Sequence, residues 1–411
     1  MKFGLLGRTL GHSFSPRIHN ALGNTNYELF EREPSQLQEF FANPELQGIN
    51  ITFPYKVNAL EACDVVDPRA ERIGCVNTMV RKDGKWHGYN TDYDGFVFTL
   101  KHAGIDVSDK ECIILGDGAS SATVHVALED LGAKSITHLS RKTAPLYTDA
   151  PNYYETAQII INCTPIGMYP HNPANLIDIM QFSKLEGVVD LIYNPRRTVL
   201  LLQAEMMNIP YCDGLPFLVA QGVEAANHFQ GESFGTKEIE QILRDMRREK
   251  ENIILIGMPG VGKTTVGKAI GKEMGRTCID VDQELAKEIG DISTYITEQG
   301  EAAFREKEAE MIAKLGTETG LVISTGGGCV TVPKNYAHLR QNGRIYQLTQ
   351  PVEKLSTSGR VLSGGGIERL RELEKTRTPM YESFAQCIVE HNRNAPETVA
   401  AILEDFEANL L

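Results

Sequence analysis

The stretch from Gly257 to Thr265 reads GMPGVGKTT and fits the phosphate-loop pattern GxxxxGK[ST]. Such a loop joins a buried strand to a helix, and its backbone N–H groups hold the phosphates of a nucleotide. The apolar run from Asn252 to Ile256 supplies the strand. Small nucleotide-binding domains begin at this strand, so we expect a new domain to start there and residues 1–251 to form a separate unit.

Length and composition restrict the class of protein. A chain of 411 residues is long enough for two to three domains. The formal net charge of −13 argues against a nucleic-acid partner, because such proteins cluster Lys and Arg on one face. The eight cysteines have no metal-binding spacing and suit a reducing compartment. The apolar run from Phe3 to Leu6 is too short for a signal or a membrane span, so we expect a cytoplasmic protein.

Apolar, β-rich runs alternate with helical patterns along the chain, which is typical of an α/β protein with parallel sheets. The expected strands are Phe3–Leu6, Ile49–Thr52, Cys112–Leu115, Ile159–Asn162, Val188–Ile192, Ile253–Ile256, Leu321–Ser324 and Ile345–Leu348. The segment from Thr236 to Lys250 places apolar residues at helical spacing among many charges, and we interpret it as a connecting helix.

A second glycine loop, from Gly116 to Ala122, follows an expected strand and opens a helical pattern that runs to Leu131. Glycines at such a place let the pyrophosphate of a dinucleotide approach the N-terminus of the helix. The loop has the first two glycines of the GxGxxG pattern, while Ser121 replaces the third. A plain strand-to-helix turn is the alternative interpretation.

The strand expected after this loop, Ser135–Leu139, ends in the sequence Ser140-Arg141-Lys142. An NAD-binding enzyme carries an acidic residue there for the ribose 2′-hydroxyl, whereas cations favour a 2′-phosphate. The sequence therefore predicts NADP as the cofactor. Asp117, inside the loop, is unfavourable beside a pyrophosphate unless its side chain points away.

Polar strings recur at the ends of apolar runs in the first third of the chain: GHSFSP from Gly11, NITFPYK from Asn50, GCVNT from Gly74 and GYNTD from Gly88. Each string alone has a structural explanation as a helix cap or a turn. Together with the loop at Gly116 and the later strings NCTPIGM, DLIYNP and DGLPFLVAQ, they closely resemble the shikimate dehydrogenase family. The resemblance spans roughly residues 1–235.

This resemblance implies roles for individual residues. The substrate carboxylate and hydroxyls would be held by Ser13, Ser15, Thr52, Asn77 and Gln221. Lys56 and Asp92 would form the catalytic pair, in which an ammonium beside a carboxylate gives a proton to the alkoxide that hydride transfer creates. An ordinary ion pair is the alternative. The NADP phosphates would contact Gly116, Gly118, Ser140 and Arg141, and Gly214 would lie near the nicotinamide.

Residues suited to phosphoryl transfer also follow the phosphate loop. Lys263 is placed to reach the β- and γ-phosphates, and Thr264 offers its hydroxyl to Mg²⁺. Further on come the strings DVD from Asp280, GEAAFRE from Gly300, STGGG from Ser324 and TRTPMY from Thr376. With the loop, this set resembles shikimate kinase over about residues 252–411.

The second resemblance also implies roles. Mg²⁺ would be held by Thr264 and Asp280, and Asp282 would orient or deprotonate the accepting hydroxyl. Arg305 and Arg377 would grip the substrate carboxylate with their planar guanidinium groups, and Arg360 would close over the transferring phosphoryl group from a lid. The backbone of Gly326, Gly327 and Gly328 would approach the substrate. ATP would be bound by Gly257, Gly260, Gly262, Lys263, Thr264 and Thr265.

The two resemblances predict four parts. These are a substrate-binding domain at 1–92 completed by a helix around 217–235, a Rossmann-like NADP-binding domain at 93–216, a linker helix at 236–251 and a phosphate-loop kinase domain at 252–411. They imply that 3-dehydroshikimate is reduced to shikimate with NADPH, and that shikimate is then phosphorylated with ATP and Mg²⁺. Two alternatives stay open: an active kinase fused to a degenerate or regulatory dehydrogenase-like domain, and a quinate or shikimate dehydrogenase that uses NAD. Oligomeric state is not predicted.

Overall fold

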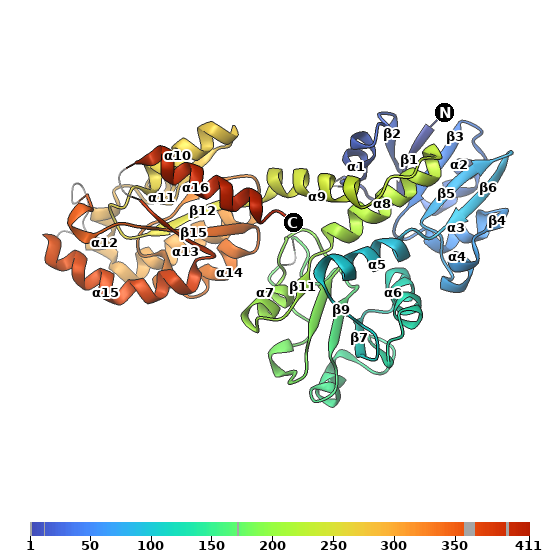
Figure 1. Ribbon diagram of the computed structural model, residues 1–411, viewed down its shortest axis with the longest axis horizontal. Coiled ribbons are helices and arrows are strands. Elements are labelled where there is room, and N and C mark those ends of the chain that lie inside the picture. The colour runs from blue at the N-terminus through green and yellow to red at the C-terminus, as the bar shows by residue number, and fades with distance from the viewer. Residues whose placement is uncertain (1, 12, 171, 357–365, 392–393) are drawn as a thin grey trace. The chain divides into compact units, whose positions relative to one another are not determined.

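The computed structural model describes residues 2–11, 13–170, 172–356, 366–391 and 394–411. The chain divides into two compact units, Met1–Leu243 and Arg244–Leu411 (Figure 1). The division falls inside helix α9 (Thr236–Lys250), the segment interpreted as a connecting helix. The finer domain limits expected from the sequence stay a prediction.

Unit 1 begins with a mixed sheet in the order β2-β1-β3-β5-β6-β4. Its strands are β1 (Lys2–Gly7), β2 (Tyr27–Glu31), β3 (Leu46–Ile51), β4 (Val65–Val66), β5 (Thr78–Lys82) and β6 (Lys85–Tyr89). Strand β3 is parallel to β1, whereas β5 runs antiparallel to both β3 and β6. The helices of this region are α1 (Ser15–Ala21), α2 (Leu37–Ala42), α3 (Lys56–Ala62) and α4 (Pro68–Ile73).

A second sheet in unit 1 is fully parallel, in the order β11-β10-β9-β7-β8. Its strands are β7 (Glu111–Leu115), β8 (Ser135–Leu139), β9 (Ile159–Asn162), β10 (Gly187–Asp190) and β11 (Tyr211–Cys212). Helices α6 (Ala119–Asp130) and α7 (Val199–Met206) connect its strands. Strands β7, β9 and β10 are mostly apolar and buried, as expected of parallel strands covered on both faces, which is why they were readable from the sequence.

Helices α5 (Asp92–Ala103) and α8 (Leu215–Gln230) pack against each other between the two sheets of unit 1 (Figure 1). Gly95 lets them approach closely, since a Cβ atom there would lie 2.8 Å from the carbonyl oxygen of Phe217. The first residue of α5 is Asp92, and the first sheet ends just before it. A predicted catalytic residue therefore lies where the two halves of unit 1 meet.

Unit 2 contains one parallel sheet in the order β13-β14-β12-β15-β16. Its strands are β12 (Asn252–Gly257), β13 (Cys278–Asp280), β14 (Val322–Ser324), β15 (Gly343–Thr349) and β16 (Cys387–Glu390). Its helices are α10 (Lys263–Met274), α11 (Val281–Ile289), α12 (Ile292–Gln299), α13 (Glu301–Thr317), α14 (Asn335–Arg340), α15 (Gly366–Phe384) and α16 (Ala395–Ala408). The phosphate loop follows β12, the central strand.

The structure confirms the α/β class, the Rossmann-like parallel sheet and the phosphate-loop fold of the C-terminal unit. Two details differ from the expected parallel sheets and strand limits. The hairpin of β5 and β6 is antiparallel, and β10 ends at Asp190 instead of continuing to Ile192. Among the described residues, no helix has the length and apolar content needed to cross a membrane.

Candidate active sites

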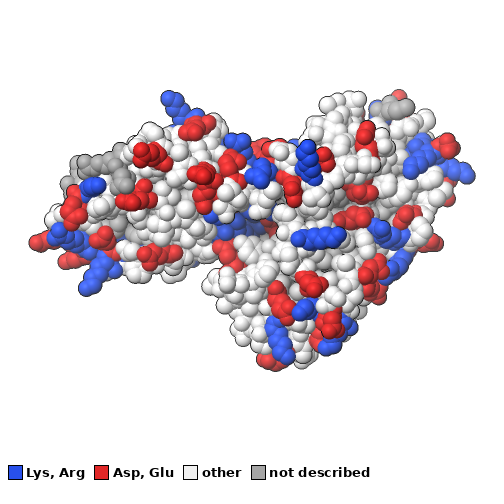
Figure 2. Space-filling model, in the orientation of Figure 1, with Lys and Arg blue, Asp and Glu red and all other residues white. Residues whose placement is uncertain are grey.

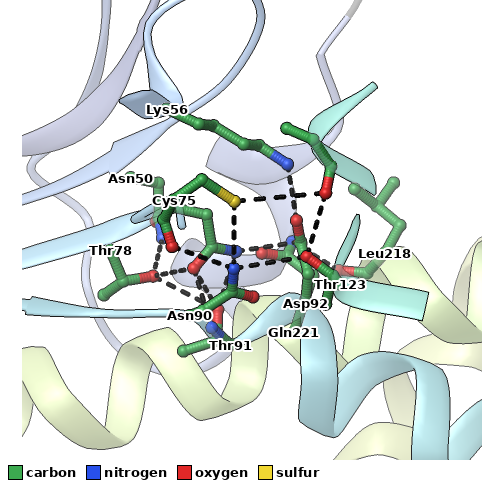
Figure 3. A network of polar contacts seen from close by, with 12 residues as sticks. Asn50, Lys56, Cys75, Thr78, Asn90, Thr91, Asp92, Thr123, Leu218 and Gln221 are labelled. Carbon is green, nitrogen blue, oxygen red and sulfur yellow. Dashed lines mark hydrogen bonds and ion pairs between the residues drawn. The ribbon is translucent and has the colours of Figure 1, made fainter. Parts of the chain in front are cut away.

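The predicted catalytic pair is formed in unit 1 (Figure 3). Lys56 is the first residue of α3 and Asp92 the first residue of α5, and the Lys56 Nζ lies 2.5 Å from the Asp92 Oδ2. The side chains are only 13% and 5% exposed, so this pair differs from an ordinary surface ion pair. Burial lowers the pKa of Lys56, but the charge and hydrogen bond of Asp92 outweigh burial and leave the pKa above its usual value. Lys56 is therefore a protonated donor at neutral pH.

Asn77 holds the other oxygen of Asp92. Its Nδ2 donates to the Asp92 Oδ1 at 2.9 Å, and its Oδ1 accepts the backbone N–H of Thr91 at 2.7 Å. The two carboxylate oxygens are thus held separately, one by Asn77 and one by Lys56. Because Asn77 fixes the orientation of the carboxylate, Asp92 presents its Oδ2 to the Lys56 ammonium from one direction.

The other predicted substrate residues surround this pair less directly. Ser13 donates from its Oγ to the Oγ of Ser15, the first residue of α1, at 3.2 Å. Thr52 follows β3, and its backbone N–H donates to Leu6. Gln221 lies on α8, where its Nε2 donates to the Leu218 carbonyl at 2.8 Å. In the described part of the chain, none of these four side chains hydrogen-bonds to Lys56 or Asp92, so their contacts with a substrate stay a prediction.

Gln221, one of these four predicted residues, packs against the helix that carries Asp92. A Cβ atom at Gly95, three residues after Asp92 on α5, would lie 3.0 Å from the Cβ of Gln221. Gln221 therefore packs one helical turn from the carboxylate, in the same close-up view as the pair (Figure 3).

The glycine loop of unit 1 forms a cradle between β7 and α6. Gly116 has a φ of +117°, and a Cβ atom there would lie 3.1 Å from both Ser121 and Thr164. Gly118 precedes α6 without a side-chain cap, and a Cβ atom there would meet open space. The uncapped N–H groups of α6 therefore face room for a pyrophosphate, and these residues fit a dinucleotide.

A cavity of about 450 Å³ opens beside this loop, and its lining includes Asp117, Gly118 and Ser140. Asp117 thus borders the cavity that would receive the cofactor, so its negative charge lies near the expected phosphates. Ser140 is buried, and its hydroxyl donates to the Thr143 carbonyl at 2.8 Å, so it also shapes the turn. Arg141 is exposed within this turn.

His138, which the sequence analysis missed, also lines this cavity. Its Nδ1 lies 3.2 Å from the Gly116 carbonyl oxygen and its Nε2 lies 2.9 Å from the Nδ1 of His125. The imidazole thereby supports the backbone of the glycine loop. No motif signals this role, because β8 and α6 bring the two histidines together only in the folded chain.

Gly214 precedes α8, where a Cβ atom would lie 2.0 Å from the Leu191 carbonyl oxygen. Glycine is therefore required for packing at the end of β10. The position of Gly214 near a nicotinamide stays a prediction.

In unit 2 the phosphate loop has the geometry that its pattern predicts. Gly257 and Gly262 have φ angles of +139° and +101°, and Gly262 precedes α10. The Lys263 Nζ donates to the carbonyl oxygens of Gly257 at 2.8 Å and Met258 at 3.1 Å. The ammonium therefore lies over the loop whose N–H groups would hold the phosphates.

Thr264 and Asp280 are brought together as expected for a magnesium site. The Thr264 Oγ1 donates to the Asp280 Oδ2 at 2.5 Å. Asp280 ends β13 and caps α11 by accepting the N–H of Gln283 at 3.2 Å. Because the strand stops at Asp280, Asp282 lies in the first turn of α11. A hydroxyl and a carboxylate are oxygen ligands of the kind that Mg²⁺ prefers.

A cavity of about 590 Å³ gathers most of the predicted kinase residues. Those on its lining are Gly260, Gly262, Lys263, Thr264, Thr265, Asp280, Asp282, Arg305, Gly326, Gly327, Gly328 and Arg377. Arg360, predicted to act from a lid, lies outside the described residues.

The glycine run beside this cavity makes room for the two arginines. A Cβ atom at Gly328 would lie 2.2 Å from the guanidinium carbon of Arg305. The Gly327 carbonyl accepts the Nη1 of Arg377 at 3.0 Å and the hydroxyl of Tyr381. Gly327 also packs on the phosphate loop, since a Cβ atom there would lie 2.7 Å from the ring of Pro259.

Glu308 is a site residue that the sequence analysis missed. It is fully buried, and its Oε2 accepts the Arg305 Nη1 at 2.6 Å. Its Oε1 has no hydrogen-bond partner among the described residues. A Cβ atom at Gly326 would lie 2.3 Å from this oxygen and 2.8 Å from the Oδ1 of Asp282. Burial, and then the charge of Asp282, raise the pKa of Glu308 against the lowering effect of Arg305.

These features define the class of the chain: an oxidoreductase unit with a dinucleotide cradle and a buried lysine–aspartate pair, followed by a phosphate-loop kinase unit. Comparison with known families agrees. Residues 5–79 match the model of the shikimate dehydrogenase substrate binding domain, and residues 259–407 match the shikimate kinase model.

Relatives and solved structures narrow the class further. The chain is 36% identical over 249 residues to the NADP(+) shikimate dehydrogenase of Clostridium beijerinckii, covering 56% of this chain and 91% of that protein. It is similar to a chorismate mutase/shikimate 5-dehydrogenase fusion protein from Clostridium acetobutylicum, with a TM-score of 0.56, 30% identity and coverage of 59% of this chain and 96% of the other. A Thermus thermophilus shikimate 5-dehydrogenase in complex with NADP(H) and shikimate gives a TM-score of 0.53, 28% identity and coverage of 60% and 99%.

The chain belongs to the shikimate dehydrogenase family, and its C-terminal unit is a shikimate kinase domain.

Proposed function

We propose that this chain catalyses two consecutive reactions: NADPH-dependent reduction of 3-dehydroshikimate to shikimate, and phosphorylation of the shikimate 3-hydroxyl by ATP. The observation that carries this proposal is the joining of a buried Lys56–Asp92 pair and a complete phosphate-loop site in one chain. The product of the first reaction is the acceptor of the second.

In the first site, bound NADPH supplies the hydride that reduces the substrate ketone. The Lys56 ammonium donates a proton to the oxygen that becomes the alcohol, and Asp92 stabilises the charged form of Lys56 before the transfer. Ser13, Ser15, Thr52 and Gln221 hold the carboxylate and hydroxyls of the substrate, and Asn77 holds Asp92 in place. Gly116 and Gly118 leave room for the pyrophosphate at the N-terminus of α6.

In the second site, the loop N–H groups and Lys263 hold the β- and γ-phosphates of ATP. Mg²⁺, when bound by Thr264 and Asp280, neutralises phosphate charge. Arg305 and Arg377 hold the carboxylate of shikimate by paired N–H donors. Asp282 accepts a hydrogen bond from the 3-hydroxyl and orients it for attack on the γ-phosphate.

A coupled assay tests the proposal. The chain is supplied with 3-dehydroshikimate, NADPH and ATP–Mg²⁺, and the products are separated by chromatography. We expect shikimate 3-phosphate, shikimate when ATP is withheld, and no turnover when NADPH is withheld. Failure to consume NADPH would support instead a regulatory dehydrogenase-like unit joined to an active kinase.

Use of NAD(H) by the first site is a second candidate, favoured by one observation. Asp117 lines the cofactor cavity, and its negative charge disfavours the more highly charged NADP(H) more than NAD(H). The assay is therefore run with NADH as well. A larger kcat/KM with NADH than with NADPH would establish this candidate.

Location and partners complete the proposal. We propose a cytoplasmic enzyme, since both reactions consume NADPH or ATP and the eight cysteines are all free thiols. Acidic and basic residues are interspersed on the face drawn in Figure 2, where no basic stripe suited to a nucleic acid is visible. Small-molecule substrates are thus the proposed partners, and cell fractionation tests the location.

A further inference from the structure

Asn77 can donate to Asp92 only if its amide group is oriented with the Nδ2 toward the carboxylate. The backbone N–H of Thr91 points at the Asn77 Oδ1 at 2.7 Å, which leaves the Nδ2 for Asp92. The same Nδ2 also donates to the Thr91 Oγ1 at 3.0 Å, so both of its hydrogens are used. The orientation of the carboxylate therefore depends on groups behind Asn77.

Thr78 is the next group in this network. Its side chain is fully buried, and its Oγ1 lies 3.1 Å from the Asn77 Oδ1 and 3.2 Å from the Thr91 Oγ1. Asn50 donates its Nδ2 to the Thr78 Oγ1 at 3.0 Å. Since the Thr78 oxygen accepts from Asn50, its own hydrogen is directed at Asn77 or Thr91.

Asn50 is itself locked in orientation from the far side. Its Oδ1 accepts the hydroxyl of Tyr27 at 2.7 Å and faces the His19 Nε2 at 3.1 Å. Burial depresses the pKa of His19 to about 3, so the ring is neutral and carries its hydrogen on the Nε2 that faces this oxygen. The Asn50 Nδ2 consequently has to face Thr78.

The sheet fixes the spacing of this network. Asn50 on β3 and Thr78 on β5 are direct partners in the antiparallel register, so their side chains lie on the same face at a set distance. Figure 3 shows Asn50, Thr78 and Thr91 in the network of polar contacts that includes Asp92 and Lys56. Buried polar networks of this kind fix one geometry when every member is satisfied.

We propose that Asn50 and Thr78 are positioning residues of the reductase, which hold the Asp92 carboxylate against Lys56 by fixing the amide of Asn77. This inference rests on the proposed dehydrogenase function. Neither residue contacts Lys56 or Asp92 directly; both act through Asn77.

The test compares three variants of the full chain. Thr78→Val keeps the shape and removes the hydroxyl, whereas Thr78→Ser keeps the hydroxyl. Thr99→Val is the matched control, because Thr99 is also a fully buried threonine, but its hydroxyl donates only to the Gly95 carbonyl in α5 at 2.8 Å. Thermal unfolding of each variant reports whether the fold is retained.

We expect Thr78→Val to lower the kcat for dehydroshikimate reduction about tenfold with little change in KM, because the proton donor is misaligned only in the chemical step. The basic limb of the pH–rate profile should move to lower pH, since a less well held Asp92 raises the pKa of Lys56 less. Thr78→Ser should restore both quantities, and Thr99→Val should leave them unchanged.

An unchanged kcat and pH profile in Thr78→Val would overturn the inference, as would equal losses in Thr99→Val. If Thr78→Val does not fold, Thr78→Ala is measured against Thr78→Ser with the same outcomes. Absence of reductase activity in the unmodified chain would instead refute the proposed function.

Discussion

The two glycine loops of this chain have the same architecture and different chemistry. Each follows an internal strand of a five-stranded parallel sheet, β7 or β12, and opens a helix of 12 residues, α6 or α10. In each the first glycine has a positive φ, +117° at Gly116 and +139° at Gly257. In each the helix begins without a side-chain cap. Both are therefore built to receive phosphate on backbone N–H groups.

Their charges differ. The loop of unit 2 carries Lys263 at the start of its helix, with the Thr264–Asp280 pair beside it. The loop of unit 1 carries Asp117, and its cavity lining includes His138, whose pKa is lowered by burial. Arg141 is exposed within the turn that follows β8.

This difference follows from what each loop must do. Phosphoryl transfer develops charge on the phosphates, so a cation and a metal must be at the loop itself. In hydride transfer the pyrophosphate only anchors the cofactor, and the chemistry that we propose takes place at Lys56 and Asp92. The first loop therefore tolerates an acidic residue that the second would not.

Removal of Mg²⁺ is expected to give the largest difference between the activities of the two sites. Chelation by EDTA should abolish ATP-dependent phosphorylation of shikimate, because Thr264 and Asp280 then have no cation to hold. Dehydroshikimate reduction should continue, and added Mg²⁺ should restore the kinase. Parallel loss of NADPH oxidation under EDTA would show that the first site also depends on a metal.

Lys263→Ala should lower the kinase kcat by about 10²- to 10³-fold, since one charged donor to the transferring group is lost. Reduction of dehydroshikimate should keep its rate. Lys268→Ala is the control, because Lys268 lies on the same helix and is exposed. A comparable kinase loss in the control would mean that the effect comes from the helix and not from the loop ammonium.

Substitution of two glycines by alanine should distinguish a glycine needed for its backbone conformation from one needed to leave room for a ligand. Gly257→Ala should destabilise unit 2 by about 1–3 kcal/mol, because its φ is positive and the new Cβ would lie 2.4 Å from the Leu348 carbonyl oxygen. Gly118→Ala should leave the unfolding temperature unchanged, because nothing lies within 4 Å of the added Cβ atom. It should weaken NADP⁺ binding, because that atom would occupy the space proposed for the pyrophosphate. Thermal unfolding and NADP⁺ titration measure the two effects. Unchanged NADP⁺ affinity in Gly118→Ala would contradict the cradle assignment.

Asp117→Asn is expected to give the smallest change, a decrease of about threefold to tenfold in the Kd for NADP⁺, because a negative charge beside the cofactor cavity is removed. The gain should shrink at high ionic strength. Asp109→Asn, at the exposed other end of β7, serves as the control. Equal affinity of the Asp117 variant and the unmodified chain would mean that Asp117 lies too far from the cofactor to matter.

Continuous apolar runs and glycine loops were the features most readable from the sequence. Strand β9 matches its predicted limits, and both loops lie between a strand and a helix as predicted. The antiparallel hairpin of β5 and β6 was missed, although Asp83 and Gly84, with φ angles of +51° and +77°, form the two-residue turn that signals it.

Residues that act through long-range contacts were not predictable. In the sequence Glu308 is one of many charged residues of α13. Only the fold shows that the glycine run packs beside its carboxylate. Asn50 and Thr78 become partners only through the register of β3 and β5. Local patterns carry no information about such pairs, because their meaning depends on strand pairing across 28 residues.

Two single-site variants test most directly that this chain holds two separate active sites for consecutive reactions. With dehydroshikimate, NADPH and ATP–Mg²⁺, Lys263→Ala should accumulate shikimate, whereas Lys56→Ala should leave dehydroshikimate unchanged but phosphorylate added shikimate. A mixture of the two variants should again form shikimate 3-phosphate. Loss of both activities in either folded variant, or no product from the mixture, would contradict the account.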